Sequence, residues 1–131
     1  MQNEVTALVV MSQERRSRLL DHLSGVGVNV RTASSCEEAV ALLREDPEVR
    51  VVLTDLALPD GSWFDVLNCV GDLKSSAEVV VCARVADERL WTQVLEAGGF
   101  DVLVEPYQER EVRRILGAAS TGRSQHLAAA S

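Results

Sequence analysis

Hydrophobic residues along this chain fall into short continuous runs that alternate with segments of helical spacing. Continuous runs rich in Val and Leu are typical of strands covered on both faces of a sheet, because neither face then needs polar residues. Two weaker segments are interpreted as edge strands, since one has Val at every second position and the other is short. The predicted strands are Val5–Met11, Val26–Arg31, Val49–Leu53, Val79–Ala83 and Asp101–Val104.

Helices are predicted after each strand, where apolar residues recur three or four positions apart. Capping residues precede the second and third of these helices, at Ser35–Glu38 and at Ser62 with Asp65. Gly98 closes the fourth helix, and the fifth is predicted to end at Gly117. The apolar positions are Leu19, Leu20 and Leu23; Ala39, Val40, Leu42 and Leu43; Trp63, Leu67 and Val70; Leu90, Val94 and Ala97; and Val112, Ile115 and Leu116.

The strand–helix alternation predicts an α/β fold, a parallel sheet with helices on both faces, because each crossover is right-handed. With the second and fifth strands at the edges, the strand order is 2-1-3-4-5, the flavodoxin-like doubly wound (βα)5 arrangement. We expect one domain over residues 1–117, followed by a flexible C-terminal tail or linker remnant over residues 118–131.

A ligand site in such a sheet lies beyond the carboxyl ends of the strands, where the winding direction switches. Here that point falls between the first and third strands. The residues that follow these strands and their neighbours are Met11 and Ser12, Asp55, Ala83 and Glu105.

Composition and charge exclude several functional classes. The chain has 131 residues, of which 47% are hydrophobic, enough to bury a core in one domain. No apolar run approaches the ~20 residues of a membrane span, and the N-terminus lacks the basic region of a secretory signal. A net charge of −7 argues against binding to nucleic acid. The densest basic group is interpreted as the solvated face of a helix: Arg15, Arg16 and Arg18.

The cysteines are widely spaced and form no C-x-x-C pair. We interpret them as reduced thiols of a cytoplasmic protein, with Cys82 directed into a core. They are Cys36, Cys69 and Cys82.

The segment Val51–Ser62, with the sequence VVLTDLALPDGS, resembles the phosphoacceptor segment of the receiver domains of two-component response regulators. In that family an apolar strand is followed by an Asp, three residues, a Pro and the start of a helix. Two further segments, Ser34–Leu43 and Ala97–Tyr107, resemble family segments as well, so that the resemblance extends over roughly Thr6 to Leu116.

This resemblance implies that Asp55 is the phosphoacceptor and that the peptide bond between Glu105 and Pro106 is cis. It also implies a signalling role without enzymatic activity, with a histidine kinase or a downstream output protein as partner. In the family, dimers and outputs use the surface of the fourth helix, fifth strand and fifth helix. By resemblance a partner or a second copy of the chain would contact Trp91, Val102 and Tyr107; alternatively, Trp91 packs against a neighbouring helix.

The sequence departs from the family pattern at the positions around Asp55. The acidic pair that holds Mg²⁺ in the family matches Met11 and Ser12, and Mg²⁺ needs hard oxygen ligands. The Thr or Ser that contacts the phosphoryl group matches Ala83, and the Tyr or Phe that moves with it matches Val102. The pairing Lys matches Glu105, which at ~6 Å and an effective dielectric of ~20 would repel Asp55 by roughly 3 kcal/mol.

Two functional hypotheses follow. The favoured one is a degenerate receiver-like domain that acts by protein–protein contact in two-component signal transduction, with no metal or other cofactor. The alternative is a phosphorylation-competent receiver in which Asp55 accepts a phosphoryl group from a histidine kinase with the help of Mg²⁺. A third hypothesis, a small enzyme with Asp55 and Glu105 as an acid–base pair, needs a pocket that the sequence does not indicate.

Overall fold

The computed structural model describes residues 5–121 of the chain, and its centre is a parallel sheet of five strands in the order β2-β1-β3-β6-β7. This order confirms the predicted flavodoxin-like fold, with the second and fifth main strands at the edges. The strands are β1 (Thr6–Val10), β2 (Asn29–Ala33), β3 (Val49–Asp55), β6 (Glu78–Ala83) and β7 (Asp101–Val104).

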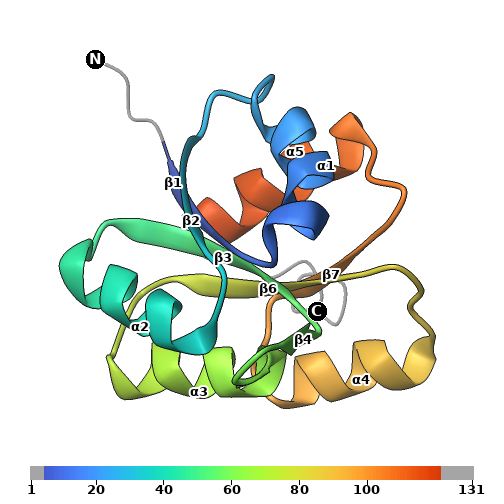
Figure 1. The fold of residues 1–131 in the computed structure, drawn as a ribbon. Helices are drawn as coiled ribbons and strands as arrows, with labels where there is room; N and C mark the ends of the chain where they lie inside the picture. The colour runs from blue at the N-terminus through green and yellow to red at the C-terminus, as the bar shows by residue number, and fades with distance from the viewer. Residues whose placement is uncertain (1–4, 122–131) are drawn as a thin grey trace.

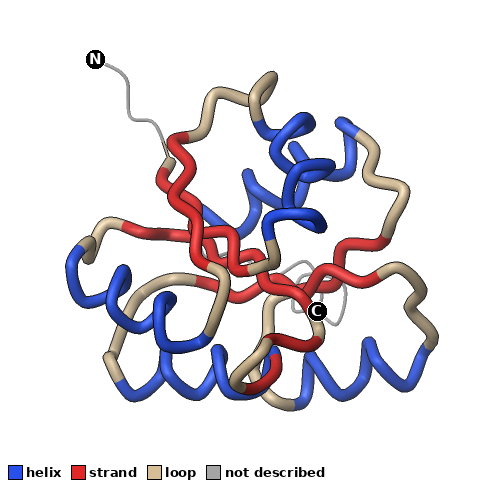
Figure 2. The backbone as a smooth tube through the Cα atoms, viewed as in Figure 1, coloured by secondary structure: helices blue, strands red, loops and turns tan. Residues whose placement is uncertain are grey.

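Helices cover both faces of the sheet in two layers. In Figure 1, α1 and α5 lie above the sheet, while α2, α3 and α4 lie below it; Figure 2 shows the strands as the layer between them. The helices are α1 (Gln13–Leu23), α2 (Cys36–Glu45), α3 (Trp63–Asp72), α4 (Glu88–Glu96) and α5 (Glu109–Ser120).

Alternate residues of each central strand enter different cores. In β1, Ala7 and Val9 pack with the side chains of α1 and α5, whereas Leu8 and Val10 pack with those of α2 and α3. Every residue of β1 is buried. This double coverage is why the four residues that follow Thr6 in the strand are all apolar, as the continuous apolar run predicted.

The second strand begins later than its alternating pattern indicated. β2 runs over Asn29–Ala33, whereas Val26 and Val28 precede it and pack partly buried against the core under α1 and α5. Gly27 between them has a φ of 78°, which belongs to a turn. The alternation therefore reflects apolar contacts of a turn as well as those of a strand.

The predicted end of the last helix was wrong. α5 continues past Gly117 to Ser120, because Ala119 is only 2% exposed and extends the apolar stripe of the helix. The predicted tail over residues 118–131 is thus helical at its start, over residues 118–120. Residues 122–131 of that tail lie outside the described residues.

A small hairpin follows β3 and was not predicted. It consists of β4 (Ala57–Leu58) and β5 (Gly61–Ser62), paired antiparallel. Ser62 then begins α3 with a capping box: its hydroxyl accepts the N–H of Phe64, and the carboxylate of Asp65 accepts the N–H of Ser62. The capping residues predicted from the sequence are therefore confirmed, and they anchor the loop that leaves Asp55.

Candidate functional site at the carboxyl end of the sheet

Asp55 is the last residue of β3, at the switch point that the fold predicts. Its neighbours in the sheet are β1 and β6, so that the carboxylate lies at the centre of the carboxyl edge. The side chain is 12% exposed. Its Oδ1 accepts the N–H of Leu56 at 2.8 Å, which fixes the orientation of the carboxylate.

The end of β1 contributes no carboxylate to this edge. Met11 is fully buried and packs in the core under α1 and α5. Ser12 is the N-cap of α1, where its hydroxyl accepts the N–H of Arg15 at 3.2 Å. Both side chains therefore have structural roles: one fills the core and the other begins a helix.

The ends of β6 and β7 are joined beside Asp55. The carbonyl of Ala83 accepts the N–H of Glu105 at 2.9 Å, and the methyl side chain of Ala83 is buried. Val102 packs with Val81 and Val94 in the core between the sheet and α4, at 2% exposure. The peptide bond between Glu105 and Pro106 is cis, as expected.

The guanidinium of Arg15 lies between two carboxylates at this edge. Its Nη2 is 3.5 Å from Oδ1 of Asp55 and 3.4 Å from Oε2 of Glu105. Arg18 contacts the other oxygen of Glu105, with 3.2 Å between Nη1 and Oε1. The repulsion expected between Asp55 and Glu105 is therefore countered by a positive charge that contacts both.

The interpretation of the arginines as a solvated helix face was wrong for two of them. The side chain of Arg15 is only 19% exposed, and Arg16 donates hydrogen bonds to the carbonyl of Met11 and the hydroxyl of Ser34. Only Arg18, at 65% exposure, projects largely into solvent. The reason is that α1 begins directly after β1, which places its first turn over the carboxyl edge of the sheet.

This role of Arg15 was missed because its partners are distant in the sequence. One signal was available: an acid in the position of the family's Lys calls for a compensating base nearby. Arg15 lies in the first turn of α1, directly after the capping Ser12 at the end of β1.

A thiol and a phenol lie beneath these charges. Cys82 is fully buried, as predicted, and packs in the same core as Tyr107, which is 6% exposed. Burial is the main cause that raises the pKa of both groups. The charge of Asp55 raises the pKa of Cys82 further, and the proximity of Cys82 raises that of Tyr107. The ring of His22 contacts that of Tyr107 edge-to-face, with 6.0 Å between centroids. Both acidic protons are therefore retained at neutral pH.

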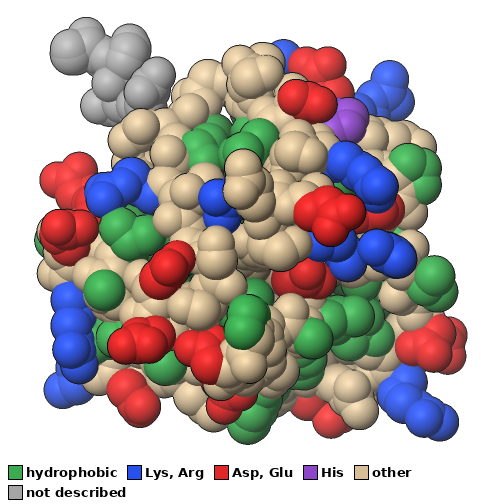
Figure 3. Space-filling view, in the orientation of Figure 1, with side chains coloured by type: hydrophobic (Ala, Val, Ile, Leu, Met, Phe, Trp, Pro, Cys, Tyr) green, Lys and Arg blue, Asp and Glu red, His purple; other side chains and the backbone are tan. Residues whose placement is uncertain are grey.

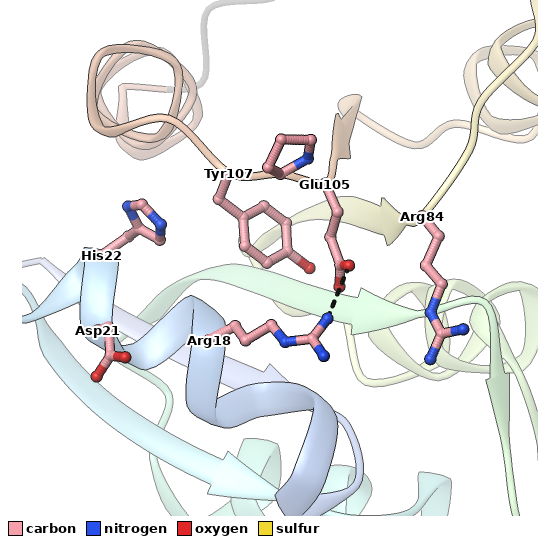
Figure 4. A pocket seen from close by; sticks show the side chains of 7 residues that line it. Arg18, Asp21, His22, Arg84, Glu105 and Tyr107 are labelled. Carbon is pink, nitrogen blue, oxygen red and sulfur yellow. Dashed lines mark hydrogen bonds and ion pairs between the residues drawn. The ribbon is translucent and has the colours of Figure 1, made fainter.

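An open cavity of about 630 Å³ adjoins these residues. Figure 4 shows Glu105 directed towards Arg18, with Tyr107 and Arg84 on either side of Glu105 in that view. Positive and negative side chains alternate around the cavity. It is lined by Arg18, Asp21, His22, Arg84, Glu105, Pro106 and Tyr107.

Residues 10–117 match the response regulator receiver domain. The chain belongs to this family. The resemblance inferred from the segments around Asp55 is thereby confirmed.

Relatives of this receiver domain include a transcriptional regulatory protein, a response regulator protein and a chemotaxis protein. It is 31% identical over 96 residues to the transcriptional regulatory protein FixJ of Rhizobium meliloti, covering 72% of this chain and 45% of FixJ. It is 29% identical to the response regulator protein PilR of Pseudomonas aeruginosa, covering 86% of this chain and 25% of PilR. The chain thus spans less than half of these first relatives. The chemotaxis protein CheY of Thermotoga maritima is 25% identical, with 80% and 88% covered.

Solved structures show the same fold. The crystal structure of FixJ-N has a TM-score of 0.76 at 26% identity, covering 93% of this chain and 97% of that one. The chemotaxis response regulator CheY4 of Vibrio cholerae has a TM-score of 0.78 at 18% identity, covering 89% and 99%.

The residues of this receiver domain do not fit the divalent cation that the family implies. Among residues 5–121, no group of three or more His, Cys, Asp or Glu side chains is arranged to hold a metal ion. Met11 offers a buried thioether where a carboxylate is needed, and the carboxylates of Asp55 and Glu105 already contact the cationic Arg15.

The predicted partner surface is corrected by the structure. Trp91 is partly buried against Val81, Val94 and Val102, below the sheet. Tyr107 belongs to the core on the opposite face, so it shares no surface with Trp91. A hollow of about 270 Å³ remains on the α4–β7–α5 side, lined by Trp91, Val102, Val104, Pro106, Gln108 and Glu111.

Within residues 5–121, no helix has both the length and the apolar character of a membrane span. On the face shown in Figure 3, Lys and Arg side chains of the described residues are interspersed with Asp and Glu. The net charge of −7 disfavours a phosphate backbone as ligand.

Proposed function

We propose that this receiver domain acts by protein–protein contact in cytoplasmic two-component signalling, without Mg²⁺-dependent phosphorylation of Asp55 and without enzymatic activity. The observation that carries the proposal is the end of β1, where Met11 is buried in the core and Ser12 caps α1. Mg²⁺ in a phosphoryl-transfer site is held by carboxylates together with the substrate phosphate and water.

The charges around Asp55 support the same conclusion. Phosphoryl transfer relies on positioning and on neutralising the charge of the transferred group. Here the position of the family's Lys carries Glu105, and the hydroxyl position carries the buried Ala83. The nearest positive charge, Arg15, already contacts two carboxylates. A phosphoryl dianion on Asp55 would have to compete with Glu105 for it.

The test is intact-mass analysis after incubation with a small acyl phosphate and Mg²⁺. The wild type and Asp55→Ala are compared, with circular dichroism to show that both are folded. We expect no phosphoryl increment on either protein. An increment on the wild type that Asp55→Ala lacks would refute the proposal and favour the alternative function, a phosphorylation-competent receiver with Asp55 as acceptor.

A gain-of-function variant serves as the matched positive control. Met11→Asp, Ser12→Asp and Glu105→Lys together restore the carboxylates and the Lys of the family pattern. An increment on this variant, provided that it folds, would show that the donor and the conditions are adequate. The absence of an increment on the wild type is then a property of its pocket.

For the partner, we propose a histidine kinase, an output protein or a second copy of the chain at the hollow beside Trp91. Self-association is the simplest case to measure, by sedimentation velocity at increasing concentration. If the partner is a second copy, the wild type dimerises and Trp91→Ala weakens the dimer. A wild type that stays monomeric at every concentration would exclude the homodimer and leave a different protein as the partner.

A further inference from the structure

We infer that the guanidinium of Arg15 supplies the positive charge of this receiver pocket in place of a metal ion. It lies between Asp55 and Glu105, where it excludes a divalent ion and links α1 to the ends of β3 and β7. This inference rests on the proposed function and deepens it. It assigns to one side chain the charge that a metal ion and a Lys would otherwise provide.

The geometry of the contact supports this assignment. A single nitrogen, Nη2 of Arg15, lies within 3.5 Å of carboxylate oxygens from two different segments of the chain. All three side chains are largely covered, with exposures of 19% for Arg15 and 12% for each acid. Ion pairs that are shielded from water are screened little by salt, so this contact persists at physiological ionic strength.

The backbone places Arg15 in advance of any ligand. Its N–H is held by the capping hydroxyl of Ser12, and the next residue, Arg16, ties the same helical turn to the carbonyl of Met11 and the hydroxyl of Ser34. Hydrogen bonds to Ser12, Met11 and Ser34 therefore hold the first turn of α1 in place. The Arg15 side chain extends from this turn to the carboxylates.

A guanidinium differs from a metal ion in its chemistry. It stays protonated at all relevant pH values and cannot dissociate from the protein, so the positive charge is independent of metal concentration. A divalent ion approaching Asp55 and Glu105 would meet this positive charge, which already contacts one oxygen of each carboxylate. The positive charge beside Asp55 and Glu105 therefore stays the same whether or not divalent ions are present in solution.

Arg18 provides the matched control within the same site. It has the same side chain and contacts the same acid, but it reaches only Oε1 of Glu105 and is 65% exposed. Removal of Arg18 therefore leaves the charge between the two carboxylates in place. Any effect specific to Arg15 is separated from a general loss of positive charge near the pocket.

The first experiment is thermal unfolding with and without millimolar MgCl₂, with calorimetric titration of MgCl₂ as the direct measure of binding. In Arg15→Gln the carboxylates of Asp55 and Glu105 lose their shared cation. Although the end of β1 still supplies no ligand, we expect these two carboxylates to bind Mg²⁺ weakly and the melting temperature to rise by a few degrees. The wild type and Arg18→Gln should show neither effect. Binding of Mg²⁺ to the wild type as strong as to Arg15→Gln would overturn the inference, as would a lack of binding in Arg15→Gln.

The second experiment is a double-mutant cycle of Arg15→Gln and Glu105→Gln, measured by urea unfolding. We expect Glu105→Gln to restore part of the stability that Arg15→Gln loses, because the double variant has one unopposed carboxylate fewer. Additive effects of the two substitutions would contradict the inference. If Arg15→Gln does not fold, Arg15→Lys replaces it in the Mg²⁺ titration: a retained cation should still prevent binding, and binding would overturn the inference.

Failure of this inference can be distinguished from failure of the proposed function. A phosphoryl increment on wild-type Asp55 refutes the proposed function, whatever the cycle shows. An additive cycle without any phosphoryl increment refutes the role of Arg15 alone. Coupling of Arg15 to Glu105, with no Mg²⁺ binding and no increment on the wild type, supports both.

Discussion

The carboxylate of Asp60 accepts the backbone N–H of Cys36 at 2.8 Å, and its other oxygen accepts that of Glu37 at 3.0 Å. Asp60 lies in the turn between β4 and β5, and Cys36 is the first residue of α2. The loop that leaves Asp55 is thus tied to the N-terminus of a different helix. These hydrogen bonds lower the pKa of Asp60, since they favour its ionised form.

The lowered pKa of Asp60 predicts how stability depends on pH. The contribution of this group is present above its ordinary pKa of about 3.9 and is lost as the pH falls through the lower value of the folded state. Asp60→Ala should therefore have a lower urea midpoint than the wild type at pH 7, and the difference should shrink below about pH 3.9. Asp72→Ala, at the exposed end of α3, is the control. A difference that persists unchanged into acid would contradict this assignment.

Gly61 lies where a side chain has no room. An added Cβ would be 2.5 Å from Oδ2 of Asp65 and 3.0 Å from Sγ of Cys36, so Gly61→Ala must displace the capping carboxylate of α3. We expect a loss of about 1–3 kcal/mol in the free energy of unfolding. At Gly71, in α3, an added Cβ meets nothing within 4 Å, and Gly71→Ala should gain up to ~1 kcal/mol. If Gly61→Ala and Gly71→Ala changed the free energy of unfolding equally in denaturant titrations, the steric explanation for Gly61 would be wrong.

The three thiols should differ in reactivity. Burial, followed by the charge of Asp60, raises the pKa of Cys36 to about 11; burial also raises the pKa of Cys69 and, most strongly, that of the fully covered Cys82. Alkylation of the native protein at pH 8, followed by peptide mass analysis, should modify Cys69 first and leave Cys82 untouched until denaturant is added. Early modification of Cys82 would show that the floor of the pocket opens.

The true end of α5 can be tested at Gly117. Inside a helix, Gly117→Ala should gain up to ~1 kcal/mol of stability, since Ala is the better helix former. Gly98 has a φ of 102°, where an L side chain is strained, so Gly98→Ala should lose more than about 1 kcal/mol. Unfolding midpoints measure both. A loss at Gly117 as large as at Gly98 would mean that the helix ends there after all.

The sequence by itself determined the layers of this protein and the place of its central acid. Continuous apolar runs mark strands covered on both faces, and β1 is such a strand, with Ala7 and Leu8 in different cores. Once the order of the strands follows from that pattern, Asp55 must lie at the switch point, because it ends the third main strand. These conclusions depend on the spacing of apolar residues along the chain, which can be seen in the sequence itself.

Only the tertiary structure decided where the charges go. The hairpin of β4 and β5 has strands too short for any period, and α5 passes Gly117 because Ala119 finds a core to enter. Arg15 meets Asp55 and Glu105 through the reach of a long side chain across segments far apart in the sequence. Such contacts depend on how close the segments come in the folded protein, and the order of residues along the chain does not show this.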